Sequence, residues 1–278
     1  MIQIFHEASE NCSRVVTENY STSFSSAIRL LHKDLRAPIR NIYGFVRFAD
    51  EIVDTFHEYD KTFLLQQFKE ATYDALQRGI SLNPILNSFQ KTVNAYDIDL
   101  ELVDDFFQSM ELDISKKIYD QKEYAEYIYG SAETVGLMCL YIFCEGNRGL
   151  FGQLAPSAKA LGAAFQKVNF LRDIKADYNG LSRTYFPGFD PRNFTEPQKK
   201  EIEEDIHHDF DIAYRGILQL PAKARFGVYV AYKYYFSLFK KIKRTKPARV
   251  LAKRIRIPNY HKALIILRAG VKNQLRLI

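Results

Sequence analysis

Two short stretches of the sequence each carry a pair of aspartates four residues apart, in surroundings that are otherwise mostly apolar. The first pair is Asp50 and Asp54, and the second pair is Asp173 and Asp177. Residues four apart in a helix lie on the same face, roughly 40° apart around the axis. Each stretch therefore predicts a helix with one polar stripe. Carboxylates buried beside apolar side chains are costly unless a cation compensates them.

Each stripe contains further polar side chains. Tyr43 and Arg47 precede the first pair and share its face within an arc of roughly 60°. Gln166 and Asn169 precede the second pair within roughly 80°, and Arg172 lies in the same stretch. Two such stripes facing each other would form an oxygen-lined pocket for hard cations, and Mg²⁺ is the usual choice when phosphate is the other ligand. The arginines would bind the remaining phosphate oxygens.

This set of side chains suits the ionisation of an allylic diphosphate. A divalent metal neutralises the charge that develops on the leaving pyrophosphate. The carbocation left behind needs a dry, apolar and partly aromatic pocket. The chain has 21 Phe and 18 Tyr but no Trp, and we expect most of these rings to form an ordinary core. Tyr43 lies on the acidic stripe, so we expect it to have a functional role rather than to be part of the core.

The composition predicts one all-α domain covering residues 1–278. Of the 278 residues, 47% are hydrophobic, which is enough for one large core. The 13 Gly and 9 Pro separate long segments without sustained alternation of period two, so no sheet is expected. We expect helices packed around a central cavity. The predicted helices cover residues 13–35, 38–55, 61–78, 84–94, 99–117, 121–145, 156–177, 196–218, 222–244 and 259–272.

The net charge of +6 is concentrated in a basic run over residues 240–256. A solvated surface, attraction to an anionic membrane and attraction to phosphate-bearing substrates all remain open as explanations. We expect no nucleic-acid partner, because no zinc-finger spacing, helix-turn-helix or RNA-recognition signature is present.

Other features predict a protein of a reducing compartment. Cys12, Cys139 and Cys144 show no metal-ligand spacing and cannot build a disulfide framework. No secretory signal is visible at the N-terminus, and the longest apolar stretch, 135–144, is too short to span a bilayer. The expected location is the cytoplasm.

Beyond these derivations, the motifs resemble those of the squalene and phytoene synthase family, over roughly residues 15 to 260. The second acidic motif, with its Gln, Asn and Arg spacing, is the most specific match. The resemblance implies the all-α isoprenoid synthase fold, also called the type I terpenoid synthase fold, as a single-domain helical bundle around a central cavity. The segments that carry it are 21–31, with its Ser-Phe sequence, 43–54, the Met-x-x-Asp patch at 110–113, the Tyr/Gly motif at 129–136, and 161–187.

The resemblance also implies roles for individual residues. Five side chains would hold Mg²⁺, with Mn²⁺ as an alternative: Asp50, Asp54, Asn169, Asp173 and Asp177. Another set would contact diphosphate or help the leaving group depart: Ser21, Ser23, Tyr43, Arg47, Gln166, Arg172, Tyr185 and Tyr235. Phe24 and Tyr129 would line the pocket near the reacting carbons. The sequence departs from the family at Glu133, where a small residue is usual. It departs again at Thr22, where relatives can carry Lys, and this change weakens a phosphate contact.

The function implied is the head-to-head condensation of two prenyl diphosphates. The resemblance favours two geranylgeranyl diphosphates, joined to phytoene through a cyclopropyl intermediate, prephytoene diphosphate, in carotenoid biosynthesis. The segments 186–188 and 256–260 look more like those of phytoene synthases. The alternative is a squalene or dehydrosqualene synthase that uses two farnesyl diphosphates. No Gly-rich dinucleotide fingerprint is present, and a phytoene synthase would need no NADPH.

Two hypotheses from other classes are weighed against this one. A non-enzymatic assembly factor with the same fold would tend to lose the acidic ligands, yet all four aspartates are present. A terpene cyclase is disfavoured by the symmetric aspartate pairs and by the segment 21–24. The apolar tails of prenyl substrates further predict peripheral attachment to a membrane, on its inner face.

Overall fold

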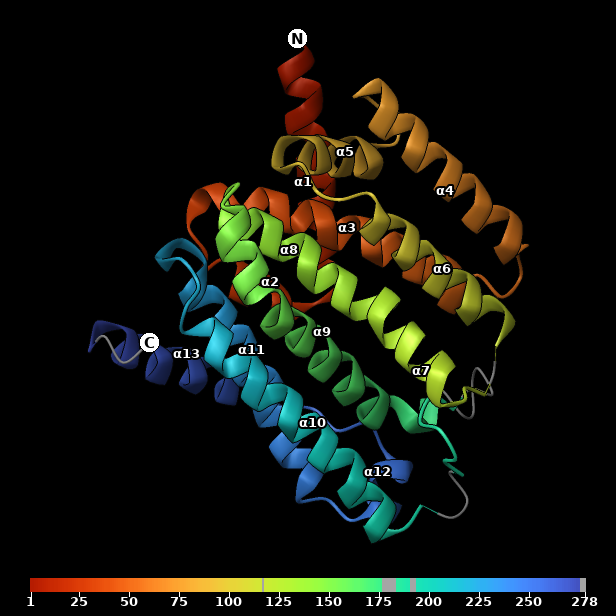
Figure 1. Cartoon of the computed structure of the whole chain (residues 1–278), viewed down its shortest axis with the longest axis vertical. Coiled ribbons are helices and arrows are strands. Elements are labelled where there is room, and N and C mark those ends of the chain that lie inside the picture. Colours follow the sequence, from red (N-terminus) through yellow and green to blue (C-terminus); the bar gives the residue numbers. More distant parts are fainter. Residues whose placement is uncertain (117, 177–183, 191–193, 276–278) are drawn as a thin grey trace.

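The structure is a computed structural model that describes residues 1–116, 118–176, 184–190 and 194–275. In these residues the fold is all-α, as predicted, and the only pairing of extended backbone is an isolated bridge between Ile118 and Thr184. Figure 1 shows the helices. Their bounds are α1 Ile2–Tyr20, α2 Thr22–Ile28, α3 Lys33–Thr55, α4 Lys61–Arg78, α5 Pro84–Tyr96, α6 Glu101–Ser115, α7 Gln121–Ile128, the π-helix η1 Tyr129–Glu133, α8 Thr134–Cys144, α9 Arg148–Ala176, α10 Glu196–Ile217, α11 Ala222–Lys243, α12 Pro247–Ala252 and α13 Asn259–Gln274.

One predicted helix is wrong, because the segment 13–35 contains a break. Ser21 leaves the helical conformation, and its hydroxyl accepts the backbone N–H of Phe24 at 3.2 Å, which caps the start of α2. Ser13, where the predicted helix begins, lies buried inside α1. The break turns the short helix α2 toward the centre of the molecule.

Two predicted starts are also wrong, because Pro38 and Pro156 lie inside helices. The helix α3 begins at Lys33 and α9 begins at Arg148. Proline costs an internal hydrogen bond, yet both helices continue through it. The short helix α12 was not expected. The other predicted helices agree with the structure to within a few residues.

The two acidic motifs lie on α3 and α9, and α9 runs through the middle of the bundle between α8 and α10 (Figure 1). Glycines let these helices approach closely. A Cβ added at Gly162 of α9 would lie 2.4 Å from the backbone oxygen of Ala132, and one added at Gly136 of α8 would lie 2.7 Å from that of Ala158. The helix carrying the second motif is therefore held backbone to backbone.

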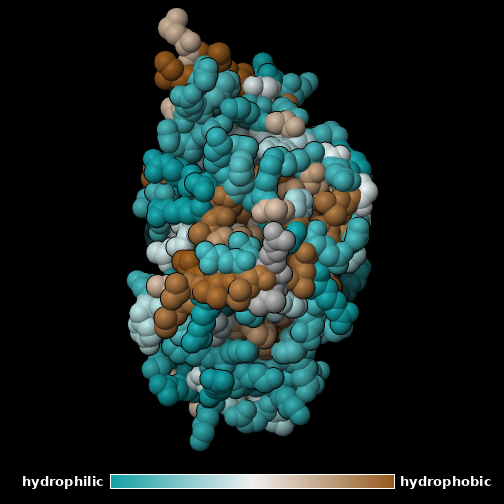
Figure 2. Space-filling view, turned by 90° about the vertical axis from the view of Figure 1, so that its left-hand side faces the viewer, coloured by the Kyte–Doolittle hydropathy of each residue, from teal (hydrophilic) through white to brown (hydrophobic). Residues whose placement is uncertain are grey.

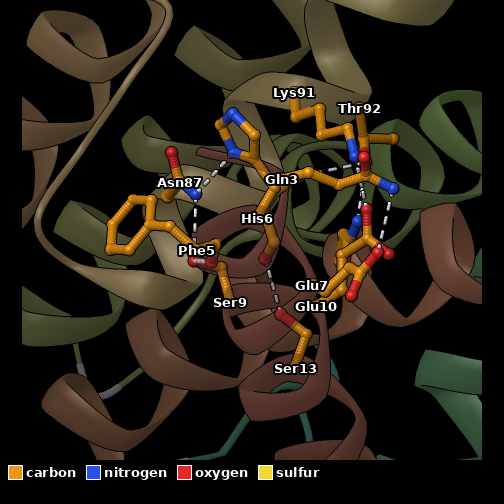
Figure 3. A network of polar contacts seen from close by, with 12 residues as sticks. Gln3, Phe5, His6, Glu7, Ser9, Glu10, Ser13, Asn87, Lys91 and Thr92 are labelled. Carbon is orange, nitrogen blue, oxygen red and sulfur yellow. Dashed lines mark hydrogen bonds and ion pairs between the residues drawn. The ribbon is translucent and has the colours of Figure 1, made fainter. Parts of the chain in front are cut away.

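Small polar side chains fix α3 from its other side. Figure 3 shows the contact between α1 and α5, where the Asn87 amide donates to the Ser9 hydroxyl at 2.9 Å. Deeper in the same contact, the hydroxyls of Ser13 and Ser88 are 2.7 Å apart. A Cβ at Gly44 of α3 would lie 3.0 Å from the Ser13 hydroxyl. This polar layer leaves α3 little freedom to shift.

A buried carboxylate ties the loop after α9 to the bundle. Asp113 of α6 accepts hydroxyl hydrogen bonds from Tyr119 and Tyr127 at 3.1 Å and from Tyr185 at 3.2 Å. The Tyr185 ring also stacks on Phe170 of α9, with centroids 4.0 Å apart. These contacts fix the position of Tyr185 relative to α9.

Within the described residues, one helical stretch, Gln121–Cys144, has the length and composition to cross a membrane. Its most apolar window is 72% buried inside the bundle. That burial is the property of a core helix.

We expect the close backbone contact between Gly162 and Ala132 to affect the free energy of unfolding. Gly162→Ala should destabilise the protein by roughly 1–3 kcal/mol, because the new methyl group overlaps backbone that cannot yield. Gly152→Ala is the matched control on the same helix, since a Cβ there meets nothing within 4 Å. It should stabilise by about 0.5–1 kcal/mol through helix propensity. Urea unfolding of both variants measures the difference, and equal effects would contradict the close packing.

Candidate active site

A cavity of about 460 Å³ lies between α2, α3, α8, α9, α10 and α11. Its lining changes from apolar to polar along each long helix. On α3 it runs from Ile39 to Asp50, and on α9 it runs from Leu154 to Arg172, a rise of roughly 27 Å. Polar residues from both predicted stripes therefore lie at one end of a long apolar chamber.

The first stripe presents a desolvated guanidinium. Arg47 pairs with Glu51, and its Nη1 lies 3.9 Å from Asp50. The group lies over the ring of Tyr20, 4.4 Å from the centroid. Its Nε is buried and has no hydrogen-bond partner. A donor with nothing to bind, at the polar end of a cavity, suits an anionic ligand.

Asp50 is a carboxyl group whose negative charge the site stabilises poorly. It lines the cavity and keeps 34% of its side chain exposed there. Burial raises its pKa to about 7, and repulsion from Asp54 adds to the rise, while Arg47 opposes it. A carboxylate in this position gains most from a bound cation.

The second stripe contains an unsatisfied acceptor. The Oδ1 atom of Asn169 is buried without a hydrogen-bond donor. Burial raises the pKa of the Tyr235 phenol, although hydrogen bonds with Asn169 and Arg172 oppose that rise. A buried amide oxygen that faces a cavity and lacks a donor is suited to a cation.

Asp173 is neutralised by two arginines. The Nε atoms of Arg172 and Arg254 lie 3.0 Å and 2.8 Å from its Oδ1. Arg254 comes from the segment after α12, and both arginines line the cavity. In this state guanidinium groups occupy the place beside Asp173 that a cation would take.

Four aromatic rings surround the chamber next to its polar end. Phe165 stacks on Tyr235 with centroids 3.9 Å apart, and Phe24 meets both rings edge-on at 6.1 Å and 6.3 Å. Tyr43 lies 5.7 Å from Phe24, and burial raises its pKa to about 12. The Tyr43 hydroxyl therefore stays protonated near neutral pH. Ring faces at this position can stabilise a cation in the cavity.

The structure brings together most of the predicted site residues. Those that line the cavity are Ser21, Phe24, Tyr43, Arg47, Asp50, Gln166, Asn169, Arg172 and Tyr235. Those placed outside its lining are Ser23, Asp54, Tyr129, Asp173 and Tyr185. Asp177 lies outside the described residues.

Two of the residues outside the lining have other contacts. The Tyr129 ring lies under the Lys159 ammonium, 4.9 Å from the centroid. Tyr129 begins the π-helix, whose wider turn changes the face that helical periodicity predicts. Tyr185 donates to Asp113, as described above. Their roles at the substrate remain predictions.

Sequence reasoning missed three residues near the site. Phe165 completes the aromatic cluster, and Arg254 reaches Asp173 from the basic run. Lys262 of α13 donates to the Thr22 hydroxyl at 2.9 Å. Only the basic run hinted at Arg254, because these contacts join distant parts of the chain.

Nowhere in the described residues do three His, Cys, Asp or Glu side chains lie close enough together to hold a metal ion. The predicted ligand set stays a prediction, because it also includes the amide of Asn169 and Asp177, which lies outside the described residues. The residues that fit a cation best are Asp50, with its raised pKa, and Asn169, with its unpaired oxygen.

Comparisons with known proteins agree with this geometry. The profile of the squalene/phytoene synthase family matches residues 17–261. Phytoene synthase 1 of Solanum lycopersicum is 26% identical over 258 residues, which are 86% of this chain and 62% of that protein. The 15-cis-phytoene synthase of Synechococcus elongatus is 26% identical over 280 residues and covers 92% of this chain and 90% of that one.

The fold has solved counterparts as well. The crystal structure of a dehydrosqualene synthase in complex with ligand superposes with a TM-score of 0.81 and covers 98% of both chains, at 18% identity. That likeness concerns the fold. The family profile covers most of the chain, including both acidic motifs. The chain belongs to the squalene/phytoene synthase family.

Proposed function

We propose that the protein joins two prenyl diphosphates head to head. Two geranylgeranyl diphosphates would give phytoene through prephytoene diphosphate, as a step in carotenoid biosynthesis. The observation that carries the proposal is the polarity of the cavity, which has an acidic and basic end, an adjoining aromatic cluster and a long apolar remainder. A prenyl diphosphate has the same order of parts, with a charged head, an allylic carbon and an apolar tail.

A divalent metal fits the polar end. Asp50, Asp54, Asn169 and Asp173 would hold it together with Asp177, and Mg²⁺ or Mn²⁺ prefers such oxygen ligands. The orphaned Asn169 oxygen supports this assignment. When bound, the metal would neutralise charge on the leaving pyrophosphate. Arg254 would have to release Asp173, at least in part, for that carboxylate to become a ligand.

The chain's own residues would bind, orient and shield the reactants. Arg47 would donate its unpaired Nε to a phosphate oxygen, and Arg172 lies at the same end of the cavity. Phe24, Phe165 and Tyr235 would face the allylic cation and exclude water from it. The Tyr43 hydroxyl, protonated at neutral pH, would serve as a hydrogen-bond donor.

The length of the prenyl chain is set by the far end of the cavity. Leu154, Ile217 and Leu220 line that end, and the hydroxyl of Ser157 beside them is hydrogen-bonded to the backbone oxygen of Ile212. Two farnesyl diphosphates are the alternative substrates, and the product would then be squalene or dehydrosqualene. A dehydrosqualene synthase shares the fold.

Prenyl tails and hydrocarbon products are apolar, so we also propose that the protein associates peripherally with a membrane from the cytoplasmic side. The basic run at residues 240–256 supports attraction to anionic lipid.

Asp50→Asn or Asp173→Asn should lower Mg²⁺-dependent turnover at least about 100-fold, because each removes a charge that would face the metal. The matched control is Asp211→Asn, an exposed helical aspartate whose partner is His207. Product formation from geranylgeranyl or farnesyl diphosphate measures the effect. Turnover near that of the wild type in either variant would contradict the proposed reaction.

The raised pKa of Asp50 predicts a pH-dependent stability of the metal-free protein. The folded-state pKa is about 7 and the ordinary value is 3.8, so the folded state holds the proton more tightly. Stability should therefore fall as pH rises from 3.8 through 7. Asp50→Asn removes this loss. Because part of the side chain is exposed, the variant should gain only on the order of 1 kcal/mol over wild type between about pH 5 and pH 8.

Urea unfolding in the presence of a chelator, at the two pH values, gives this comparison. Asp211→Asn again serves as the control. If the stability gained by Asp50→Asn were the same at both pH values, the proposed cost of burying the Asp50 charge would be refuted.

Leu154→Phe should shorten the apolar end. If the substrate is geranylgeranyl diphosphate, kcat/KM for it should fall about tenfold or more, while farnesyl diphosphate is affected less. Steady-state kinetics with both substrates, alongside thermal unfolding of the variant, separates a shortened cavity from a damaged core. An equal loss for both substrates would show that Leu154 does not limit tail length.

A further inference from the structure

The helix α13 is apolar on two opposite faces. Ile265 and Ala269 are buried against the bundle, where α13 packs on α11. The opposite face carries five large apolar side chains that each keep 45–70% of their surface exposed: Tyr260, Leu264, Leu267, Val271 and Leu275. At 100° per residue these five lie within an arc of roughly 80° and extend over roughly 22 Å. We name them the outer stripe.

Figure 2 looks onto the side of the molecule where α13 lies and shows apolar side chains gathered in a patch there. A contiguous apolar patch on a monomer usually marks a contact surface. Lone exposed leucines need no such explanation, but five apolar side chains on one helical line do.

The charges of α13 identify the partner. Arg268 and Lys272 follow one edge of the outer stripe within roughly 60°. The helix has no Asp or Glu in its sequence, Asn259–Gln274, and the basic residues Lys253 and Arg256 precede it. An apolar stripe bordered by cations only is the pattern of a helix that lies in the interface of an anionic bilayer.

The same charges argue against a second copy of this chain. A symmetric contact through α13 brings the same face of both copies together. Because the helix carries only positive charges, such a contact would gather cations without a counter-charge. An anionic lipid surface supplies that counter-charge.

Two contacts join α13 and its approach to the site. Lys262 binds Thr22 at 2.9 Å, next to Ser21 of the cavity lining, and Arg254 binds Asp173. A bilayer seated on α13 would thus lie beside the elements that border the cavity.

We propose that the outer stripe of α13 is a docking surface for an anionic lipid bilayer, with Leu264 and Leu267 inserted among the lipids and Arg268 and Lys272 at their head groups. This deepens the peripheral attachment proposed above by naming its surface, and only the surface of α13 enters, so docking can fail or succeed independently of the reaction.

The absence of Trp makes a direct test possible. Leu267→Trp places one indole on the outer stripe, and Leu82→Trp places one at a fully exposed leucine before α5 as the matched control. Added vesicles of phosphatidylcholine with phosphatidylglycerol should shift the emission of the Leu267 variant to the blue and leave the Leu82 variant unchanged. No shift at Leu267, or equal shifts at both positions, would overturn the proposal.

Vesicle flotation tests the energetic contribution. Leu264→Gln with Leu267→Gln should lower partition onto the same vesicles about tenfold or more. Leu82→Gln with Leu100→Gln should not, since both are exposed leucines outside α13. Vesicles of phosphatidylcholine alone should bind the wild type less. Circular dichroism and thermal unfolding check that the variants fold.

The remaining outcomes separate docking from catalysis and from self-association. A stripe variant that no longer floats but turns over detergent-dispersed prenyl diphosphate has lost docking alone. If the wild type does not turn over detergent-dispersed prenyl diphosphate, that result counts against the proposed reaction and leaves the docking proposal standing. A wild-type dimer in gel filtration that the stripe variant abolishes, without vesicle binding, would assign the stripe to a second copy and overturn the proposal.

Discussion

Negative charge at the head of an apolar chamber is the constraint on which this structure depends. Carboxyl groups from α3 and α9 are placed where water is scarce, so each needs a positive partner or a proton. Asp173 has two arginines, whereas Asp50 has one distant arginine and a neighbour of like charge. Positive charge is therefore in excess around Asp173 and in deficit around Asp50. In the reaction that we propose, a divalent cation and a diphosphate would complete the charge balance.

The bundle uses its closest packing to keep these helices in place. Backbone contacts at Gly162 and Gly136 fix α9 against η1 and α8, and the polar layer around Ser13 fixes α3. Both devices use small residues, which gain little hydrophobic energy but allow close approach. The positions of the acidic motifs thus depend on the small residues, glycine and serine, at the helix contacts.

Much of this could be predicted from the sequence, because helical periodicity decides which side chains share a face. Part of each stripe lines the cavity, namely Tyr43, Arg47 and Asp50 on α3 and Gln166, Asn169 and Arg172 on α9, and the motif match predicted the all-α fold. The predictions failed where a single residue interrupts the regular helical pattern. Ser21 caps a new helix inside an amphipathic segment, and the π-turn at Tyr129 rotates the faces of the residues after it. The partner of Asp173 could not be predicted, since Arg254 is 81 residues away and only tertiary packing brings it there.

That separation has a consequence for how the protein is made. Domains form as the chain leaves the ribosome, with the N-terminal parts available first. Both acidic motifs have emerged long before the guanidinium of Arg254. A nascent chain that already contains α3 and α9 therefore lacks part of its counter-charge. Because of this order of synthesis, the centre of the molecule is one of the last regions that can reach its native structure.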